Sequence, residues 1–401
     1  MEDLNEERGL KTGYKVSLII CIGAITILCI LSGIIALWGR VNIFEDMPAG
    51  GIIDYFSAYP LEIYLFYIIS TCITLIILFC IKREVLRKWF VIAYMFLVLI
   101  CVIFSLFDFN VIAGGLFLGS FFFSMGVLQT IGLIPMTFFL YSYECTSDES
   151  QYKPSSLLFW IELIVAFIIV PTIMGIKFWR YAGDTLAYIV TVILIFLKFA
   201  LDGYISKKKI GIVIGIIMIS FVIIFCINYS SEYINNRLSA AFTGGQSDPY
   251  GYGYMYLETK RAMKDMLLIG NGAEYFDDAS KLLYTKLAID YPLISFGLSF
   301  GIIFVVLIVL AIVGIAIFLL FLSRKCAKAF EGYLCFGTAI YFILKLMISI
   351  IAEFLLFIYL RPPFLGSRWQ VATDIILFAT CVVLANRQMK ITEQVDMNKE
   401  D

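Results

Sequence analysis

Residues 293–322 read LISFGLSFGIIFVVLIVLAIVGIAIFLLFL and contain no charged side chain. A helix that crosses the roughly 30 Å hydrocarbon core of a bilayer needs about 20 apolar residues in succession. The stretch is therefore predicted to be a transmembrane helix. Because it is longer than one bilayer thickness, it must tilt, break or protrude.

The rest of the chain repeats this pattern, which predicts an all-α polytopic membrane bundle of about ten transmembrane helices in a single membrane domain, 1–401. Of its residues, 61% are hydrophobic and 15% charged, against about 45–50% and about 25% in soluble domains. The apolar stretch nearest the N-terminus, 16–38, has too long an apolar core for a signal peptide. In 111–141, several glycines and Pro135 indicate close packing, a break or a short re-entrant turn. The further apolar stretches are 16–38, 61–81, 89–107, 111–141, 157–176, 184–203, 209–227, 333–360 and 371–386.

The composition excludes several classes of function. The chain has no histidine, which removes Ser-His-Asp and Cys-His catalysis and histidine-ligated metals. Its 30 basic and 31 acidic residues balance without a dominant basic block, so nucleic acid is not an expected partner. The ten cysteines show no CxxC spacing and are expected to act mostly as small hydrophobic residues. No metal site is predicted, although a divalent cation stays open as a cofactor.

Clusters of Lys and Arg predict the orientation, because such residues mark the cytoplasmic side. Ten spans place all four clusters on one side together with both termini, so the chain is expected in the cytoplasmic membrane with N and C inside. Spans one to seven then occupy 16–227 and spans eight to ten 293–386. Residues 228–292 form a large extracytoplasmic loop and 387–401 a cytoplasmic tail. The clusters lie at 82–88, 207–209, 324–328 and 387–390.

Short motifs in the C-terminal half follow one another in a familiar order. A basic run at 207–209 precedes an apolar stretch, after which come Arg237 and Asp248-Pro249. With this order and spacing, residues 200–390 resemble the SEDS family of FtsW/RodA/SpoVE-type cell-wall polymerases. The remaining motifs that carry the resemblance are Gly253-Tyr254-Met255, Gly270-Asn271-Gly272, Ser295-Phe296-Gly297 and Pro363-Phe364-Leu365-Gly366-Ser367-Arg368.

The resemblance implies an enzyme that polymerises a lipid-linked sugar pyrophosphate of the lipid II type at the outer face, in cell division or cell-shape control. It also implies a single-span penicillin-binding transpeptidase as partner. The chain departs from the family where the essential aspartate should stand, because that position holds Lys286. The glutamate and lysine of the family's fourth helix are also missing, where this chain has Gln129-Thr130-Ile131-Gly132.

Glycosyl transfer needs a carboxylate that accepts the proton of the attacking hydroxyl. Four acids of the outer loop are candidates: Asp290, Asp277, Asp278 and Glu274. Asp290 lies four residues after Lys286, so the two share a face if the eighth helix already begins there. Because Pro292 suits a first helical turn, Asp290 near the N-cap is at least as good an interpretation. Asp277 and Asp278 are more simply explained as solvated loop acids.

The reaction also needs cations that hold the pyrophosphate. Arg237, Lys286, Arg361 and Arg368 all fall on the face where positive charge is normally depleted. Planar guanidinium groups beside helix ends suit phosphate, whereas the alternative is snorkelling of long side chains to the interface.

Lys345 is a candidate substrate-binding residue of a different kind, because it falls in the middle of span nine. A charge at that depth requires a partner or a wet cavity and indicates function. Glu353 lies eight residues further on, about 12 Å of helical rise, which is too far for a close pair.

Three other functions stay open from the sequence. A catalytically degenerate SEDS-like scaffold or regulator of envelope assembly would explain Lys286. An O-antigen-type polymerase or ligase shares the many spans and the one large external loop. A transporter is indicated only by Lys345 and Glu353, and no internal repeat supports it.

Overall fold

The structure is a computed structural model, and it describes about half of the chain. The described residues are 13–31, 92, 94–96, 99, 111–112, 115–118, 121–145, 163–165, 167, 182–205, 211, 214–215, 239, 242–246, 257, 259–261, 263–270, 291–327, 329–356, 361–365 and 368–400. Span 61–81 lies outside them, and spans 89–107, 157–176 and 209–227 are described at only a few positions. The predicted site residues Arg237, Asp277, Asp278, Lys286 and Asp290 also lie outside them.

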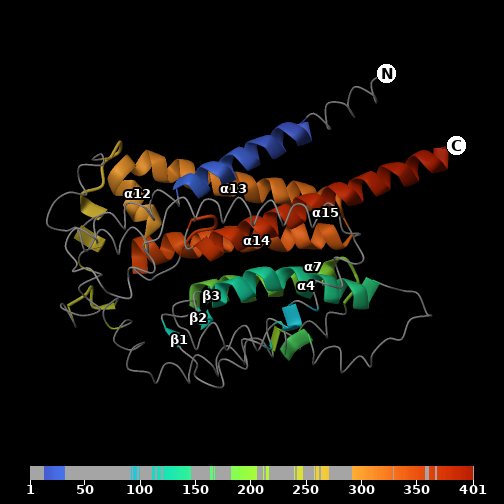
Figure 1. Cartoon of the computed structure of the whole chain (residues 1–401), viewed down its shortest axis with the longest axis horizontal. Coiled ribbons are helices and arrows are strands. Elements are labelled where there is room, and N and C mark those ends of the chain that lie inside the picture. Colours follow the sequence, from blue (N-terminus) through green and yellow to red (C-terminus); the bar gives the residue numbers. More distant parts are fainter. Residues whose placement is uncertain are drawn as a thin grey trace.

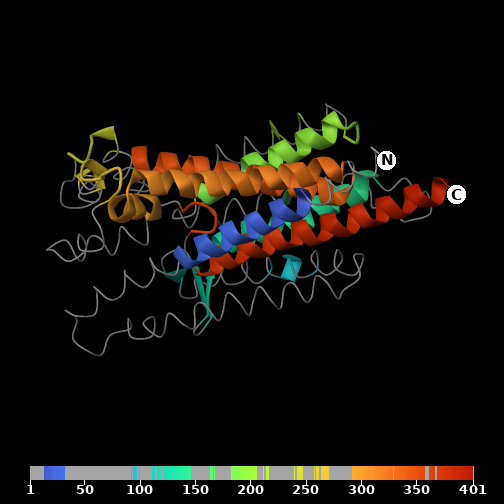
Figure 2. The same ribbon diagram turned by 90° about the horizontal axis from the view of Figure 1, so that it is seen from above.

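Five of the described helices are long and apolar enough to cross a membrane, and they pack side by side in a bundle (Figure 1, Figure 2). The predicted fold class, a multi-pass membrane helical bundle, is confirmed. The membrane-crossing segments are Gly13–Leu31, Gly183–Leu201, Ile302–Lys325, Phe330–Phe354 and Gln370–Thr392.

The stretch 111–141 is not one helix, which corrects its predicted bounds. Three short antiparallel strands come first, in the order β1-β2-β3: β1 Val111–Ile112, β2 Gly115–Leu118 and β3 Phe121–Ser124. Leu116 pairs with Val111 on one side and with Phe123 on the other. Strands form here instead of a helix because glycines interrupt the helical pattern and the aromatic run 121–123 favours strand. Helix α4, Met125–Cys145, then continues through Pro135.

The long stretch 293–322 breaks into two helices, one of the three outcomes that its length allowed. Helix α12, Pro292–Phe300, ends at Gly301, and α13, Ile302–Lys325, begins directly after it. Gly301 has φ 92°, and a Cβ there would lie 2.3 Å from the Leu268 carbonyl oxygen. Only glycine fits this backbone conformation and close approach without strain.

Helix α14, Phe330–Ile351, lies at the centre of the bundle and continues into the short π-helical segment η5, Ala352–Leu356. It packs against α13, α4, α7 (Ala182–Leu201) and α15 (Arg368–Glu400). Close fits hold it there: the Phe199 and Tyr333 rings stack with centroids 3.9 Å apart. The interior is therefore apolar and tightly packed along most of its length.

The directions of the helices agree with a chain that crosses back and forth. α4, α7, α13 and α15 run one way, whereas the Gly13–Leu31 helix and α14 run the other way (Figure 1, Figure 2). The Cys326 thiol donates to the Ala385 carbonyl oxygen at 3.6 Å, so the end of α13 lies beside the middle of α15. We call this end of the bundle the basic end, and it carries Lys15, Arg324, Lys325, Arg387 and Lys390.

Candidate functional site

A buried cluster of charged and polar side chains lies toward the end opposite the basic end. At its centre, Lys345 of α14 is fully buried. Its ammonium lies 3.3 and 3.2 Å from the two carboxylate oxygens of Asp374 on α15. Asp184 in the first turn of α7 is the second counter-ion, at 3.9 Å. The sequence predicted that Lys345 requires a partner or a wet cavity, and in the structure two aspartates from separate helices provide the partner.

Asp374 also fixes the turn that precedes α15. Its Oδ2 accepts a hydrogen bond from the Phe364 backbone N–H at 3.0 Å. Phe364 has φ 62°, which is unusual for a bulky residue and persists only where the surroundings enforce it. The Phe364 ring packs edge-on against Phe342 of α14 at 5.0 Å. One carboxylate thus neutralises a buried lysine and holds a strained turn against the bundle.

Asp184 has a favourable environment of a different kind. It lies in the first turn of α7, where the helix dipole stabilises negative charge. The Gln370 side-chain amide donates to its Oδ1 at 3.5 Å. Its side chain is 5% exposed, whereas those of Lys345 and Asp374 are 0% exposed. We call Lys345, Asp374 and Asp184 the buried triad. Asp184 is therefore the member of this triad nearest to the surface.

Neutral polar groups extend the cluster to α4. The Gln129 side-chain amide donates to the Thr185 hydroxyl at 2.7 Å, and the Thr130 and Tyr341 hydroxyls lie 3.0 Å apart. The Lys345 ammonium also lies over the Tyr341 ring, 5.6 Å from its centroid. Four helices, α4, α7, α14 and α15, thus contribute polar groups to one region of the bundle.

Glu353 in η5 performs a separate task. Its Oε2 accepts hydrogen bonds from the backbone N–H groups of Leu293 at 2.9 Å and Ile294 at 3.3 Å. These are among the first N–H groups of α12, which have no partner within their own helix. The sequence left open Asp290 near this cap; the cap position belongs to Tyr291, which makes no side-chain cap bond. The capping carboxylate is Glu353, from 60 residues further along the chain.

Three of the predicted substrate-binding residues fall in described parts of this region. Lys345 lies at the centre of the cluster, and Arg368 is the first residue of α15. Arg361 is half-buried at the start of the 361–365 turn, and its positive charge interacts electrostatically with both Asp184 and Glu353. Lys345 and Glu353 have separate partners, as their eight-residue spacing predicted.

Sequence reasoning missed two acids and two amides of the cluster: Asp184, Asp374, Gln129 and Gln370. The signal for Asp374 was available, because it stands inside the predicted span 371–386 as Lys345 does inside 333–360. Gln370 and Asp374 are four residues apart and therefore share a helix face. Among the residues that the structure describes, no group of three or more acids or cysteines is placed to hold a metal ion.

Comparison with known proteins gives a match at the level of fold. No family model and no curated protein matches the sequence. A chain from the structure described as "Structural coordination of polymerization and crosslinking by a peptidoglycan synthase complex" superposes with a TM-score of 0.55 at 12% identity. The match covers 90% of this chain and 97% of the other. The chain has a SEDS-like fold. The buried cluster thus belongs to a SEDS-like bundle, which directs the choice of function.

Proposed function

We propose that this chain is a membrane glycosyltransferase that polymerises a lipid-linked peptidoglycan precursor at the outer face of the cytoplasmic membrane. One observation carries the proposal: a fold shared with a chain of a peptidoglycan synthase complex encloses a cluster of charged and polar side chains from four helices. Lys and Arg favour the cytoplasmic side, so the basic end faces the cytosol. The cluster then lies toward the outer leaflet.

The proposed reaction joins an acceptor sugar hydroxyl to the anomeric carbon of the donor. A carboxylate takes the hydroxyl proton, the bond between the sugar and the lipid pyrophosphate breaks, and cations stabilise the leaving pyrophosphate. Asp290 is the first candidate for the base, followed by Asp277 and Asp278. Asp184 joins them because it is the most exposed acid of the triad.

The proposed cations are Arg361 and Lys345, with Arg237, Lys286 and Arg368 as further contacts. Lys345 is held closely by Asp374 and more loosely by Asp184, at 3.2 Å and 3.9 Å. A phosphate that competes with Asp184 would gain a lysine already positioned by Asp374. The arrangement therefore suits a cation that changes partners when an anionic substrate enters.

A single-span penicillin-binding transpeptidase is the proposed partner, in cell division or cell-shape control. The similar structure is described as coordinating polymerization and crosslinking, two steps that need two activities. A second candidate function, a scaffold of envelope assembly without catalysis, is favoured by two observations. Lys286 stands where the SEDS resemblance places the essential aspartate, and Asp374 and Glu353 are both engaged in holding backbone.

The test gives purified full-length protein a lipid II substrate and resolves glycan chains on a gel. We expect product in the native chain, its loss in the variant whose base is removed (Asp290→Asn or Asp184→Asn) and a reduced rate in Arg361→Gln. Asp202→Asn is the matched control, since Asp202 follows α7 at the basic end and bonds Lys198 and Tyr333. The scaffold function gains support if no glycan forms while the transpeptidase still binds.

A further inference from the structure

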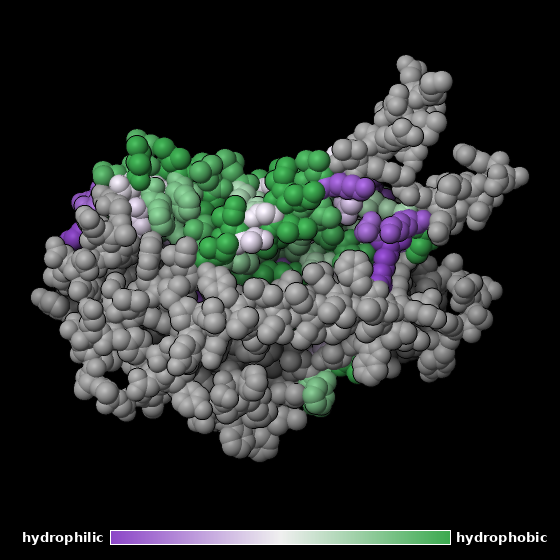
Figure 3. Space-filling model, turned by 45° about the horizontal axis from the view of Figure 1, so that its top comes forward, coloured by the Kyte–Doolittle hydropathy of each residue, from purple (hydrophilic) through white to green (hydrophobic). Residues whose placement is uncertain are grey.

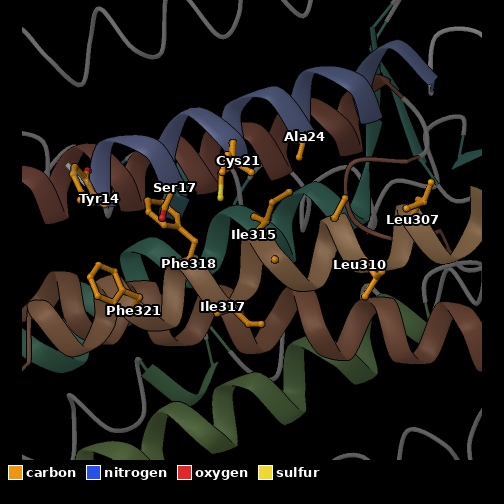
Figure 4. A pocket seen from close by; sticks show the side chains of 14 residues that line it. Tyr14, Ser17, Cys21, Ala24, Leu307, Leu310, Ile315, Ile317, Phe318 and Phe321 are labelled. Atoms are coloured by element: carbon orange, nitrogen blue, oxygen red, sulfur yellow. The ribbon is translucent and has the colours of Figure 1, made fainter. Parts of the chain in front are cut away.

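An apolar groove runs between the Gly13–Leu31 helix and α13, away from the buried cluster. Its volume is about 1050 Å³. Figure 4 shows Tyr14, Ser17, Cys21 and Ala24 along one wall and Ile315 and Phe318 along the other. Of these, the Cys21 and Ile315 side chains are buried.

Small residues widen the groove between the two helices, which contact each other through the stacked rings of Tyr14 and Phe318, 6.0 Å between centroids. The lining includes Ser17 and Ala24 on one helix and Ala311 and Gly314 on the other. A Cβ added to Gly314 would meet no heavy atom within 4 Å. The space is therefore open to an occupant rather than closed by packing.

The length of the groove matches one leaflet of a bilayer. One wall runs from Gly13 to Ala24, about 16 Å of helical rise, and the other from Leu307 to Phe321, about 21 Å. Half of the roughly 30 Å hydrocarbon core is about 15 Å. Ile20, Leu310 and Ile317 on its rim are exposed, so the groove opens where lipid chains would lie.

Positive charge gathers at one end of this apolar surface. Lys15 follows Tyr14 directly, and the Lys325 ammonium lies 5.7 Å from the Phe321 ring centroid. Tyr14 and Phe321 both line the groove, and Lys15, Arg324 and Lys325 are exposed. Figure 3 shows hydrophilic residues beside the apolar face on the side where the basic end lies. A basic pocket between transmembrane helices is the usual setting for an anionic lipid headgroup.

We infer that this groove binds an anionic glycerophospholipid, with one acyl chain between the two helices and the phosphate beside Lys15, Arg324 and Lys325. A transmembrane helix of a partner fits less well, because it needs about 30 Å of apolar surface and the two walls of the groove span only about 16 Å and about 21 Å. The inference depends on neither the proposed reaction nor the acids of the cluster.

Native mass spectrometry of the purified full-length protein tests the site, with phosphatidylglycerol and phosphatidylcholine as probes. We expect one tightly held phosphatidylglycerol, weaker binding of phosphatidylcholine, and about a fivefold loss of affinity for each cation removed in Arg324→Gln and Lys325→Gln. Gly314→Phe fills the groove and should abolish the tight binding. If that variant does not fold, as judged by its Tm, Ala311→Leu replaces it.

Two matched controls separate the groove from general effects. Gly23→Phe adds the same ring at a glycine that also has no heavy atom within 4 Å of its added Cβ but does not line the groove. Lys390→Gln removes one exposed charge from the same end of the bundle, on α15. Both should bind phosphatidylglycerol as the native chain does. Native-like binding in Gly314→Phe, equal binding of the two lipids, or crosslinking of a protein instead of lipid to a photoreactive residue at position 310 would overturn the inference.

Discussion

Lys345 illustrates how a single residue within an apolar span can organise several elements. A charge in the hydrocarbon region is costly unless it is paired, and this lysine draws Asp374 of α15 and Asp184 of α7 to α14. Asp374 in turn binds the Phe364 N–H. The cost of burying the Lys345 charge is thus offset by its contacts with the two aspartates, and these contacts also position a turn and two helices.

Replacing Lys345 with Met should therefore destabilise the protein strongly. The change leaves two buried carboxylates without their cation, and breaking a buried pair from one side costs about 3–5 kcal/mol. Thermal unfolding in detergent micelles measures the loss. The double variant Lys345→Met with Asp374→Leu should recover part of the stability, because it removes an uncompensated charge.

A control pair on the same scale is Lys198 with Asp202, joined at 3.4 Å with both side chains about a quarter exposed. Lys198→Met should cost only about 0.5 kcal/mol, since partly solvated pairs contribute little. Equal losses in Lys345→Met and Lys198→Met would contradict the structural role of the buried triad.

Among the helices and strands, sequence length predicted that the long spans tilt, break or protrude, but not which of these happens or where. The stretch 293–322 was too long for one crossing, and the break at Gly301 depends on backbone contacts with 267–268, far away in sequence. The strands at 111–124 were missed because an uninterrupted apolar run reads equally as helix or buried strand. The interior charge of Lys345 could be predicted, whereas its partners depend on which helices become neighbours.

Gly301→Ala should loosen the junction between α12 and α13. The Cβ would meet the Leu268 carbonyl oxygen at 2.3 Å, and φ 92° adds about 1–2 kcal/mol for any residue with a side chain. The Ile302 N–H bonds the Leu267 carbonyl oxygen at 3.0 Å, so its hydrogen exchange should become faster. Gly314→Ala is the control, where the same change in mid-helix should stabilise by about 0.5–1 kcal/mol. Unchanged exchange at Ile302 in Gly301→Ala would contradict this account of the break.

At the scale of the whole molecule, two ends differ in chemistry. The basic end carries exposed Lys and Arg residues, and the other end carries the buried cluster and the exposed tip Leu267-Leu268-Ile269. The sequence predicted this division from charge counts alone, because the positive-inside rule needs no knowledge of packing. It could not predict that acids from α7 and α15 would meet Lys345.

The orientation of these two ends across the membrane leads to a direct labelling prediction. Leu268→Cys, at a residue that is 66% exposed, should react in intact cells with a maleimide that cannot cross the membrane. Lys390→Cys, exposed at the basic end, should react only after the cells are permeabilised. The native chain supplies the background: of the free cysteines in the described part of the chain, 21, 326, 335 and 381 are buried and Cys29 is partly buried. The reverse pattern would place the buried cluster on the cytosolic side, out of reach of a precursor presented at the outer face, and would remove the basis of the proposed polymerase.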